Sequence, residues 1–142
     1  MQKVILTIFL AAAIAFGQQG GDAKKGPSSQ AKVLTRAEFD ALLAKPEQIL
    51  LLDVRRPDEI TNNGGFPAYL SIQFAELEKN LAWIPRDRMI VAVSNHAGRG
   101  GQAADLLARH GFKVAGTIGA QVYETQGGKL TKIVPPAPAN NK

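Results

Sequence analysis

The 142-residue sequence contains no cysteine, only two histidines and few aromatic residues. Without cysteine the chain can form neither a disulfide bond nor a thiolate nucleophile, and it offers no cysteine for lipid attachment. The two isolated histidines, His96 and His110, lack the spacing of a structural zinc site, so the sequence predicts no metal and no other cofactor. The stability of the folded protein must therefore come from an apolar core alone.

Long hydrophobic runs are absent as well. The longest apolar stretch, Val4–Ile14, is shorter than the roughly 20 residues that cross a bilayer. It follows Lys3 and precedes Ala15-Phe-Gly17, a small-x-small sequence that is typical of a cleaved export signal. We expect residues 1–17 to be a signal peptide and the mature protein to be periplasmic or secreted, with no membrane span after cleavage. An uncleaved anchor is the alternative interpretation.

The central part of the chain also lacks an excess of charge, although the whole sequence carries a formal charge of +5 and an isoelectric point near 9.7. Between Val33 and Gly128 there are ten Lys or Arg and eleven Asp or Glu, so this stretch is nearly neutral. The excess positive charge lies in the flanking segments, where solvated tails account for it. The sequence therefore predicts no nucleic-acid partner.

Composition divides the remainder of the chain into three segments. Residues 18–32 are rich in Gly, Ser, Gln and Lys and are expected to form a flexible linker. Residues 33–133 are numerous enough for one domain with one core. Residues 134–142 contain three prolines and are expected to be a disordered tail.

Apolar runs alternate with helical patterns within the domain. Strands are expected at residues 49–54, 89–93 and 113–118, because each run is short, apolar and bounded by polar or small residues. Helices are expected at 35–43, 74–81 and 99–110, with a helical turn at 122–125. Thr35 and Glu38 have the spacing of a capping box at the start of the first helix. This alternation predicts an α/β fold with a central parallel sheet and helices on both faces.

The loop that follows the strand at 89–93 is the most informative feature of the chain. It connects a buried strand to a helix, and the N-terminus of a helix carries unpaired N–H donors and the positive end of the helix dipole. The sequence therefore predicts an anion-binding loop, which consists of Ser94, Asn95, His96, Ala97, Gly98 and Arg99.

Three segments, in order, resemble the rhodanese domain, the α/β module of thiosulfate and related sulfurtransferases. Leu51–Arg55 is similar to the family's aspartate-valine-arginine signature, and Gly64–Pro67 is similar to its glycine-histidine-isoleucine-proline segment. Ser94–Arg99 falls where the family has its active-site loop. The resemblance extends from Thr35 to about Lys132 and implies a single rhodanese-like domain.

The departures from the family's pattern concern its chemistry. The resemblance implies that the first loop residue is a cysteine that holds sulfur as a persulfide, and Ser94 stands at that position. A serine hydroxyl stays protonated near neutral pH unless a base activates it. Gly65 also replaces the family's histidine. We therefore expect no catalytic residue, no sulfurtransferase activity and a pseudoenzyme built on the family's scaffold.

Asp53 and Arg55 are the candidate supporting residues. Asp53 ends a strand and is expected to hold a neighbouring loop. The Arg55 guanidinium either points at an anion in the loop or pairs with Glu59 on the surface. The resemblance implies that Arg99 shapes the loop and holds an anionic substrate.

A serine hydrolase is disfavoured. His96 is the only nearby base for Ser94, and no third residue is evident to orient its imidazole.

Three hypotheses about function follow. The first is an exported, non-catalytic module that binds a small anion or a protein partner. The second is an enzyme, either a sulfurtransferase-related protein with residual activity or a phosphate-directed one. The third is an accessory role in an envelope assembly, with a vestigial loop. Thermal stabilisation by anions separates the first hypothesis from the third.

Overall fold

The structure is a computed structural model that describes residues 28–132 and residue 134. The expected signal peptide, most of the expected linker and the expected tail apart from Val134 lie outside the described residues. Within the described ranges, no helix is long and apolar enough to cross a membrane.

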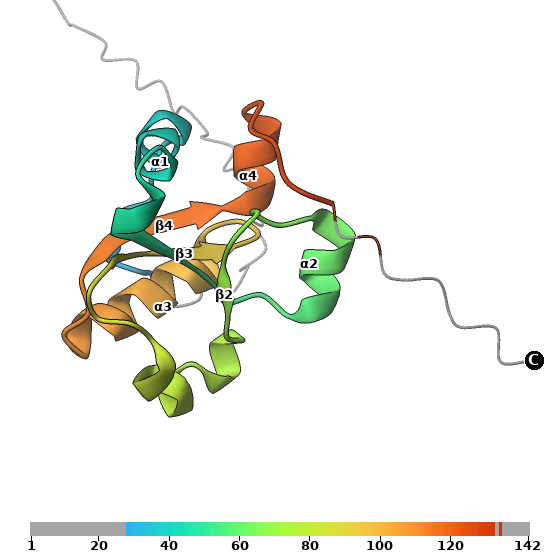
Figure 1. Ribbon diagram of the computed structural model, residues 1–142. Coiled ribbons are helices and arrows are strands. Elements are labelled where there is room, and N and C mark those ends of the chain that lie inside the picture. The colour runs from blue at the N-terminus through green and yellow to red at the C-terminus, as the bar shows by residue number, and fades with distance from the viewer. Residues whose placement is uncertain (1–27, 133, 135–142) are drawn as a thin grey trace, which may run out of the picture.

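A parallel sheet of four strands forms the centre of the domain (Figure 1). Its strands are β1 (Ile49–Asp53), β2 (Leu70–Ser71), β3 (Met89–Ser94) and β4 (Val114–Gly119), in the spatial order β2-β1-β3-β4. The inner strands β1 and β3 are almost entirely apolar and buried, as expected for a parallel sheet covered on both faces. The predicted α/β fold with a central parallel sheet is confirmed.

Helices cover both faces of this sheet. The helices are α1 (Arg36–Leu43), α2 (Pro57–Asn63), α3 (Gly98–Arg109) and α4 (Ala120–Thr125), with 3-10 helices η1 (Pro46–Gln48), η2 (Phe74–Glu76) and η3 (Glu78–Trp83). On one face, α1 and α4 pack around Phe39, whose ring makes edge contacts with Phe66 and Tyr123 at 5.0 and 5.3 Å between centroids. On the other face, α3 contributes Leu107 to a second apolar cluster. Figure 1 places α1 and α4 on one side of the strands and α3 on the other.

Two segments outside the regular strands extend the edges of the fold. Val33 forms a parallel bridge with Thr117 beside β4, and the N–H of Leu34 donates to the Thr117 carbonyl at 2.9 Å. Near the other end of the chain, Gly65 forms an antiparallel bridge with Thr131. Both ends of the domain are therefore held by backbone hydrogen bonds.

Most of the predicted elements are present to within two residues. The capping box is confirmed, since the Glu38 N–H donates to Thr35 Oγ1 at 3.3 Å and the Thr35 N–H donates to Glu38 Oε2 at 2.9 Å. Gly111 ends α3 with a φ of 78°, in the left-handed conformation that glycine favours.

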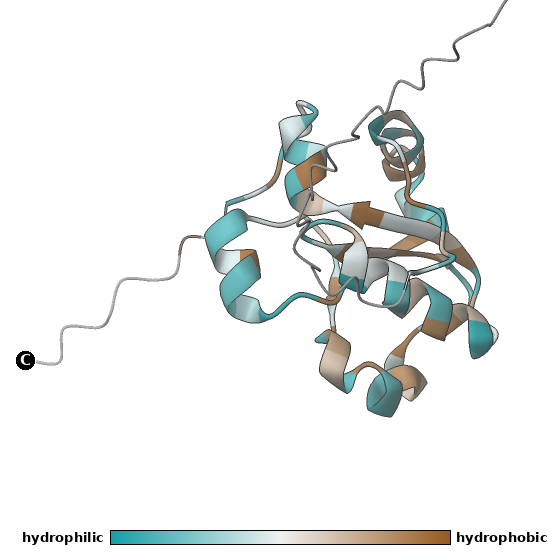
Figure 2. Cartoon of the chain, turned by 180° about the vertical axis from the view of Figure 1, so that it is seen from behind, coloured by the Kyte–Doolittle hydropathy of each residue, from teal (hydrophilic) through white to brown (hydrophobic). Residues whose placement is uncertain are grey.

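Three elements differ from the prediction. The expected helix at 74–81 is replaced by η2 and η3, because the chain there makes tight turns around a single fully buried side chain, Leu77, and gains too few α-helical bonds to continue. Strand β2 and helix α2 were not predicted from the sequence. Figure 2 shows α2 as a largely hydrophilic helix. Ile60 is its one buried residue, so the sequence has little apolar periodicity there.

Residues 28–32, which the composition assigns to the linker, lie against α3. The Gln30 N–H donates to Asp105 Oδ2 at 3.0 Å. A Cβ atom at Gly101 would come within 2.7 Å of the Ser29 side chain, so the glycine allows this close approach. Contacts with the domain therefore begin before Val33.

Candidate functional site

Ser94 lies at the carboxyl end of β3 and is 1% exposed. Its Oγ accepts a hydrogen bond from the Gly100 N–H at 3.1 Å. Helix α3 needs this contact, because its N-cap residue is Ala97, whose side chain cannot accept a bond from the free N–H groups of the first turn. The Ser94 hydroxyl therefore serves as a cap for α3.

His96 does not share this environment. It is exposed, whereas Ser94 is buried. In the described part of the chain no hydrogen bond joins the two side chains. A base that activates serine must lie within hydrogen-bond reach of its hydroxyl, so the geometry does not support a serine hydrolase.

Asp53 and Arg55 form a buried ion pair at the end of β1. Arg55 Nε donates to Asp53 Oδ1 at 2.9 Å and Nη2 donates to Asp53 Oδ2 at 2.7 Å, with both side chains at most 1% exposed. This two-pronged geometry is the strongest form of a carboxylate–guanidinium contact. The alternative in which Arg55 pairs with Glu59 on the surface is therefore wrong, because Arg55 is buried and pairs with Asp53.

The Nη1 atom of Arg55 donates hydrogen bonds that connect β1 to two other segments. Nη1 donates to the Gly64 carbonyl at 3.0 Å, where α2 ends, and to Asn95 Oδ1 at 3.2 Å in the loop. The Asn95 amide in turn donates to Glu59 Oε1 at 2.8 Å. A continuous chain of hydrogen bonds therefore runs from Asp53 through Arg55 and Asn95 to α2.

Arg99 is paired with Glu59. Its Nη1 donates to Glu59 Oε2 at 2.8 Å and its Nη2 donates to Glu59 Oε1. The Glu59 side chain is 12% exposed and the Arg99 side chain 34% exposed. The hydrogen bond from Arg99 is the main reason why the pKa of Glu59 falls to about 2, and the same contact raises the pKa of Arg99. The charge of Arg99 is therefore balanced by Glu59.

This pair predicts a pH dependence of stability. The pKa of Glu59 is lower in the folded protein than its ordinary value of 4.5, so the stabilisation is complete above that pH and is lost as the pH falls towards 2. We expect Glu59→Gln to lower the free energy of unfolding by about 1–2 kcal/mol at pH 7, after allowance for solvent screening. Urea titrations of both proteins between pH 2 and pH 7 measure this difference, which should shrink in acid.

Glu38 must be separated from this effect, because Lys32 and Thr35 also lower its pKa to about 2. It is present in both proteins and cancels in their difference. A difference between parent and variant that stays constant down to pH 2 would contradict the assignment to Glu59.

The loop also contains a strained residue. Ala97 has a φ of 65°, and it is the one non-glycine residue with a positive φ in the described part of the chain. Alanine pays about 1–2 kcal/mol in this left-handed conformation, and glycine does not. We expect Ala97→Gly to raise the free energy of unfolding by about 0.5–1 kcal/mol, since glycine's greater freedom in the unfolded chain cancels part of the gain. Gly98→Ala is the neighbouring control, because a Cβ there meets nothing within 4 Å. A fall in stability for Ala97→Gly would show that the alanine is not strained.

The structure brings Ser94, Asn95 and Arg99 together with the supporting residues Asp53 and Arg55, whereas His96 and Gly98 lie on the exposed side of the loop. The pairing of Glu59 with Arg99 was not predicted from the sequence. A signal was present in Pro57-Asp-Glu59, since proline followed by two acidic residues is typical of the first turn of a helix. Recognition of that helix would have placed a carboxylate near the loop.

The charges of the site are balanced. Arg55 is paired with Asp53 and Arg99 with Glu59, while Arg56 forms an exposed pair with Asp58. Positive potential at the loop therefore comes chiefly from the N-terminus of α3 and the backbone N–H groups.

The sequence matches no protein-family model and no curated protein. Solved structures do resemble the fold. A rhodanese-related protein from Thermoplasma volcanium superposes with a TM-score of 0.62 and 22% identity, over 70% of this chain and 97% of that one. The reduced CoADR-RHD of Bacillus anthracis gives 0.60 and 28% identity, over 67% of this chain and 17% of that one.

A thiosulfate sulfurtransferase from Pseudomonas aeruginosa gives a TM-score of 0.59 and 25% identity, over 72% of this chain and 20% of that one. This chain thus corresponds to a fifth or less of the Bacillus and Pseudomonas proteins. Together with the sequence motifs, these likenesses show that the domain has a rhodanese-like fold, in a chain that contains no cysteine.

Proposed function

We propose that the protein is an exported rhodanese-like domain that transfers no sulfur and acts as a binding module for a small anion or a protein partner. The proposal rests on Ser94. Its hydroxyl is buried and accepts a hydrogen bond from the Gly100 N–H, in a position where the family's chemistry requires a reactive thiolate. No other residue of the chain can supply a thiol.

Arg99 is the loop arginine that an anion can reach, because it is partly exposed and Arg55 is buried. Glu59 already occupies its guanidinium, so an anion must displace this carboxylate or bind beside it. Small anions are therefore expected to bind weakly. A partner that presents an acidic side chain to the loop gains additional contacts and binds more tightly.

Sulfur transfer from thiosulfate to cyanide tests the first half of the proposal. We expect the purified protein to show only the uncatalysed rate. In a Ser94→Cys variant, the Gly100 N–H and the N-terminus of α3 should lower the pKa of the new thiol below its ordinary value of about 8.5, which alkylation rates measure against pH. Activity gained only by the variant would show that the scaffold is intact. Activity in the parent would overturn the proposal.

Thermal shift with thiosulfate and with phosphate tests the second half. A ligand that binds only the folded state raises the melting temperature with its concentration. We expect a small rise for the parent, a larger rise for Glu59→Gln, in which Arg99 is released, and none for Arg99→Ala. If Arg99→Ala responds as the parent does, the loop arginine plays no part in anion binding. If no protein responds, the loop is vestigial and the accessory role is favoured.

Export is supported by Lys3, the apolar stretch after it and the small residues before Gln18. N-terminal sequencing of the protein recovered from a periplasmic or secreted fraction is expected to begin at Gln18. A product that retains Met1 and sediments with membranes would favour the uncleaved anchor.

A further inference from the structure

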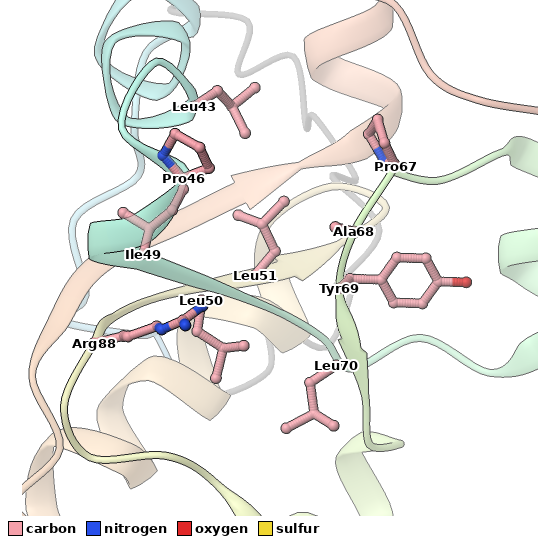
Figure 3. A pocket seen from close by; sticks show the side chains of 10 residues that line it. All are labelled: Leu43, Pro46, Ile49, Leu50, Leu51, Pro67, Ala68, Tyr69, Leu70 and Arg88. Carbon is pink, nitrogen blue, oxygen red and sulfur yellow. The ribbon is translucent and has the colours of Figure 1, made fainter.

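A second site lies away from the loop, at the edge of the sheet where β1 begins (Figure 3). It is an open groove of about 540 Å³ between the α1–η1 segment and residues 67–70. Nine of its ten lining residues are apolar or aromatic, and the tenth is Arg88. The volume is in the range of ligand sites, and none of the loop residues 94–99 contributes to it.

The groove follows a stretch of sheet edge that no other strand of the described residues covers. The short strand β2 pairs only with Leu52 and Asp53 of β1. The Asp53 carbonyl accepts from the Ile72 N–H at 3.1 Å, so the peptide groups of Asp53 face this edge. Alternate residues of a parallel strand face the same neighbour, and the N–H groups of Ile49 and Leu51 therefore point to this edge as well, ahead of the first residue of β2.

These peptide groups lie in a largely covered setting. Ile49 and Leu51 are each only 6% exposed. A covered N–H group without a partner costs about 1–3 kcal/mol, and such groups are rare in native structures. The open edge is therefore suited to a ligand that supplies carbonyl groups at the spacing of a strand.

The lining residues lie on both faces of the sheet. Figure 3 shows Leu51 directed towards α1 and Leu43, and Leu50 and Leu70 directed to the opposite face. Ile49 and Leu51 belong to the core cluster under α1, and Leu50 and Leu70 pack against the other cluster. Successive side chains of an extended peptide alternate in the same way, so a strand beside β1 would place apolar side chains on each face.

Arg88 supplies a charge at one end of the groove. It is exposed, and no ion pair or hydrogen bond of its guanidinium to another described residue is found. Arg88 directly precedes Met89, whose backbone pairs with Ile49 at the start of β1. A strand antiparallel to β1 would end at this point, where its terminal carboxylate meets the guanidinium.

We propose that the groove binds the apolar C-terminal end of a partner protein, which adds a strand antiparallel to β1 and places its terminal carboxylate on Arg88. This inference rests on the proposed role as a binding module and assigns the partner a second surface. Its test is independent of the loop, because thiosulfate and phosphate act at Arg99 and a peptide acts at the groove.

The experiment is a selection from random tetrapeptides that are immobilised through their N-termini and carry free C-terminal carboxylates. We expect enrichment of peptides with apolar side chains. For the enriched peptides in solution, amidation of the C-terminus and Arg88→Gln should each weaken binding at least tenfold. Arg109→Gln removes another exposed arginine, which does not line the groove, and should leave binding unchanged. Ala68→Trp fills the groove from its exposed rim and should abolish binding.

Amide hydrogen exchange reports on the sheet edge itself, and bound peptide should slow the exchange of the Ile49 and Leu51 amides. The proposal is overturned if no peptide is enriched, or if enriched peptides bind equally well as amides and to Arg88→Gln. It is also overturned if the two amides are already protected in the free protein and become exposed when residues 135–142 are removed, because the occupant is then the chain's own tail.

Discussion

Asp53→Asn is expected to lower the free energy of unfolding by about 3–5 kcal/mol, the largest effect of any single substitution proposed for this protein. The change keeps the size of the side chain but removes the charge that balances Arg55. Since both side chains are almost completely buried, the guanidinium then remains in the interior without a counter-ion. Domains of this size have a free energy of unfolding of only about 5–15 kcal/mol, so the substitution removes a large part of the stability. Urea denaturation followed by circular dichroism measures the loss.

Two further variants show whether the charge itself is responsible. Asp58→Asn removes one partner of the exposed pair with Arg56 and should change the stability far less than Asp53→Asn does. The double variant Asp53→Asn with Arg55→Met removes both buried charges and should recover part of the loss, because no unpaired charge remains. A double variant less stable than Asp53→Asn alone would mean that the contacts of Arg55 with Gly64 and Asn95 outweigh the charge balance.

Gly100→Ala is expected to cost about 2–3 kcal/mol and to disturb the loop. A Cβ at this position would lie 2.3 Å from Thr117 Oγ1 and 3.2 Å from both Ser94 Oγ and the Ala92 carbonyl. Thr117 cannot move aside freely, since it is fully buried and its hydroxyl donates to the Ala92 carbonyl at 2.9 Å. The first turn of α3 must therefore shift away from β3, and the bond from the Gly100 N–H to Ser94 is lost with it.

Gly98→Ala in the same turn is the matched control. Its Cβ meets nothing within 4 Å and its φ is not positive, so alanine should stabilise the helix slightly. Thermal unfolding of the two variants beside the parent measures the contrast. Equal melting temperatures for Gly100→Ala and the parent would show that the strand and helix can separate without cost.

Elements with long apolar patterns were predictable, and short ones were not. The strands β1 and β3 each bury a continuous apolar run, and α3 repeats buried residues at helical spacing, so local sequence was sufficient. Helix α2 buries only Ile60, and its N-terminal signals are a proline and two acidic residues. Strand β2 has two residues and exists only because β1 offers it a partner.

The position of the candidate site in the sequence was predictable, but the ion pairs of its arginines were not. A connection between a buried strand and a helix is a local feature, which is why the sequence could place residues 94–99 at the junction of β3 and α3. The partners of Arg55 and Arg99 depend on where α2 lies in the folded chain, forty residues from the loop in the case of Glu59. From the sequence, Glu59 was one of two alternative partners for Arg55. In the structure Glu59 pairs with Arg99, and Arg55 pairs with its near neighbour Asp53.

The two backbone bridges at the margins of the fold join segments that are far apart in the sequence, which delays their formation during folding. Val33 pairs with Thr117, and Gly65 pairs with Thr131. Each of these earlier residues can therefore pair only after a much later residue has been synthesised. Contacts between distant parts of a sequence form slowly, because the intervening chain must first be ordered. A nascent chain therefore has no partner for Val33 until Thr117 has been synthesised, and none for Gly65 until Thr131 has been synthesised.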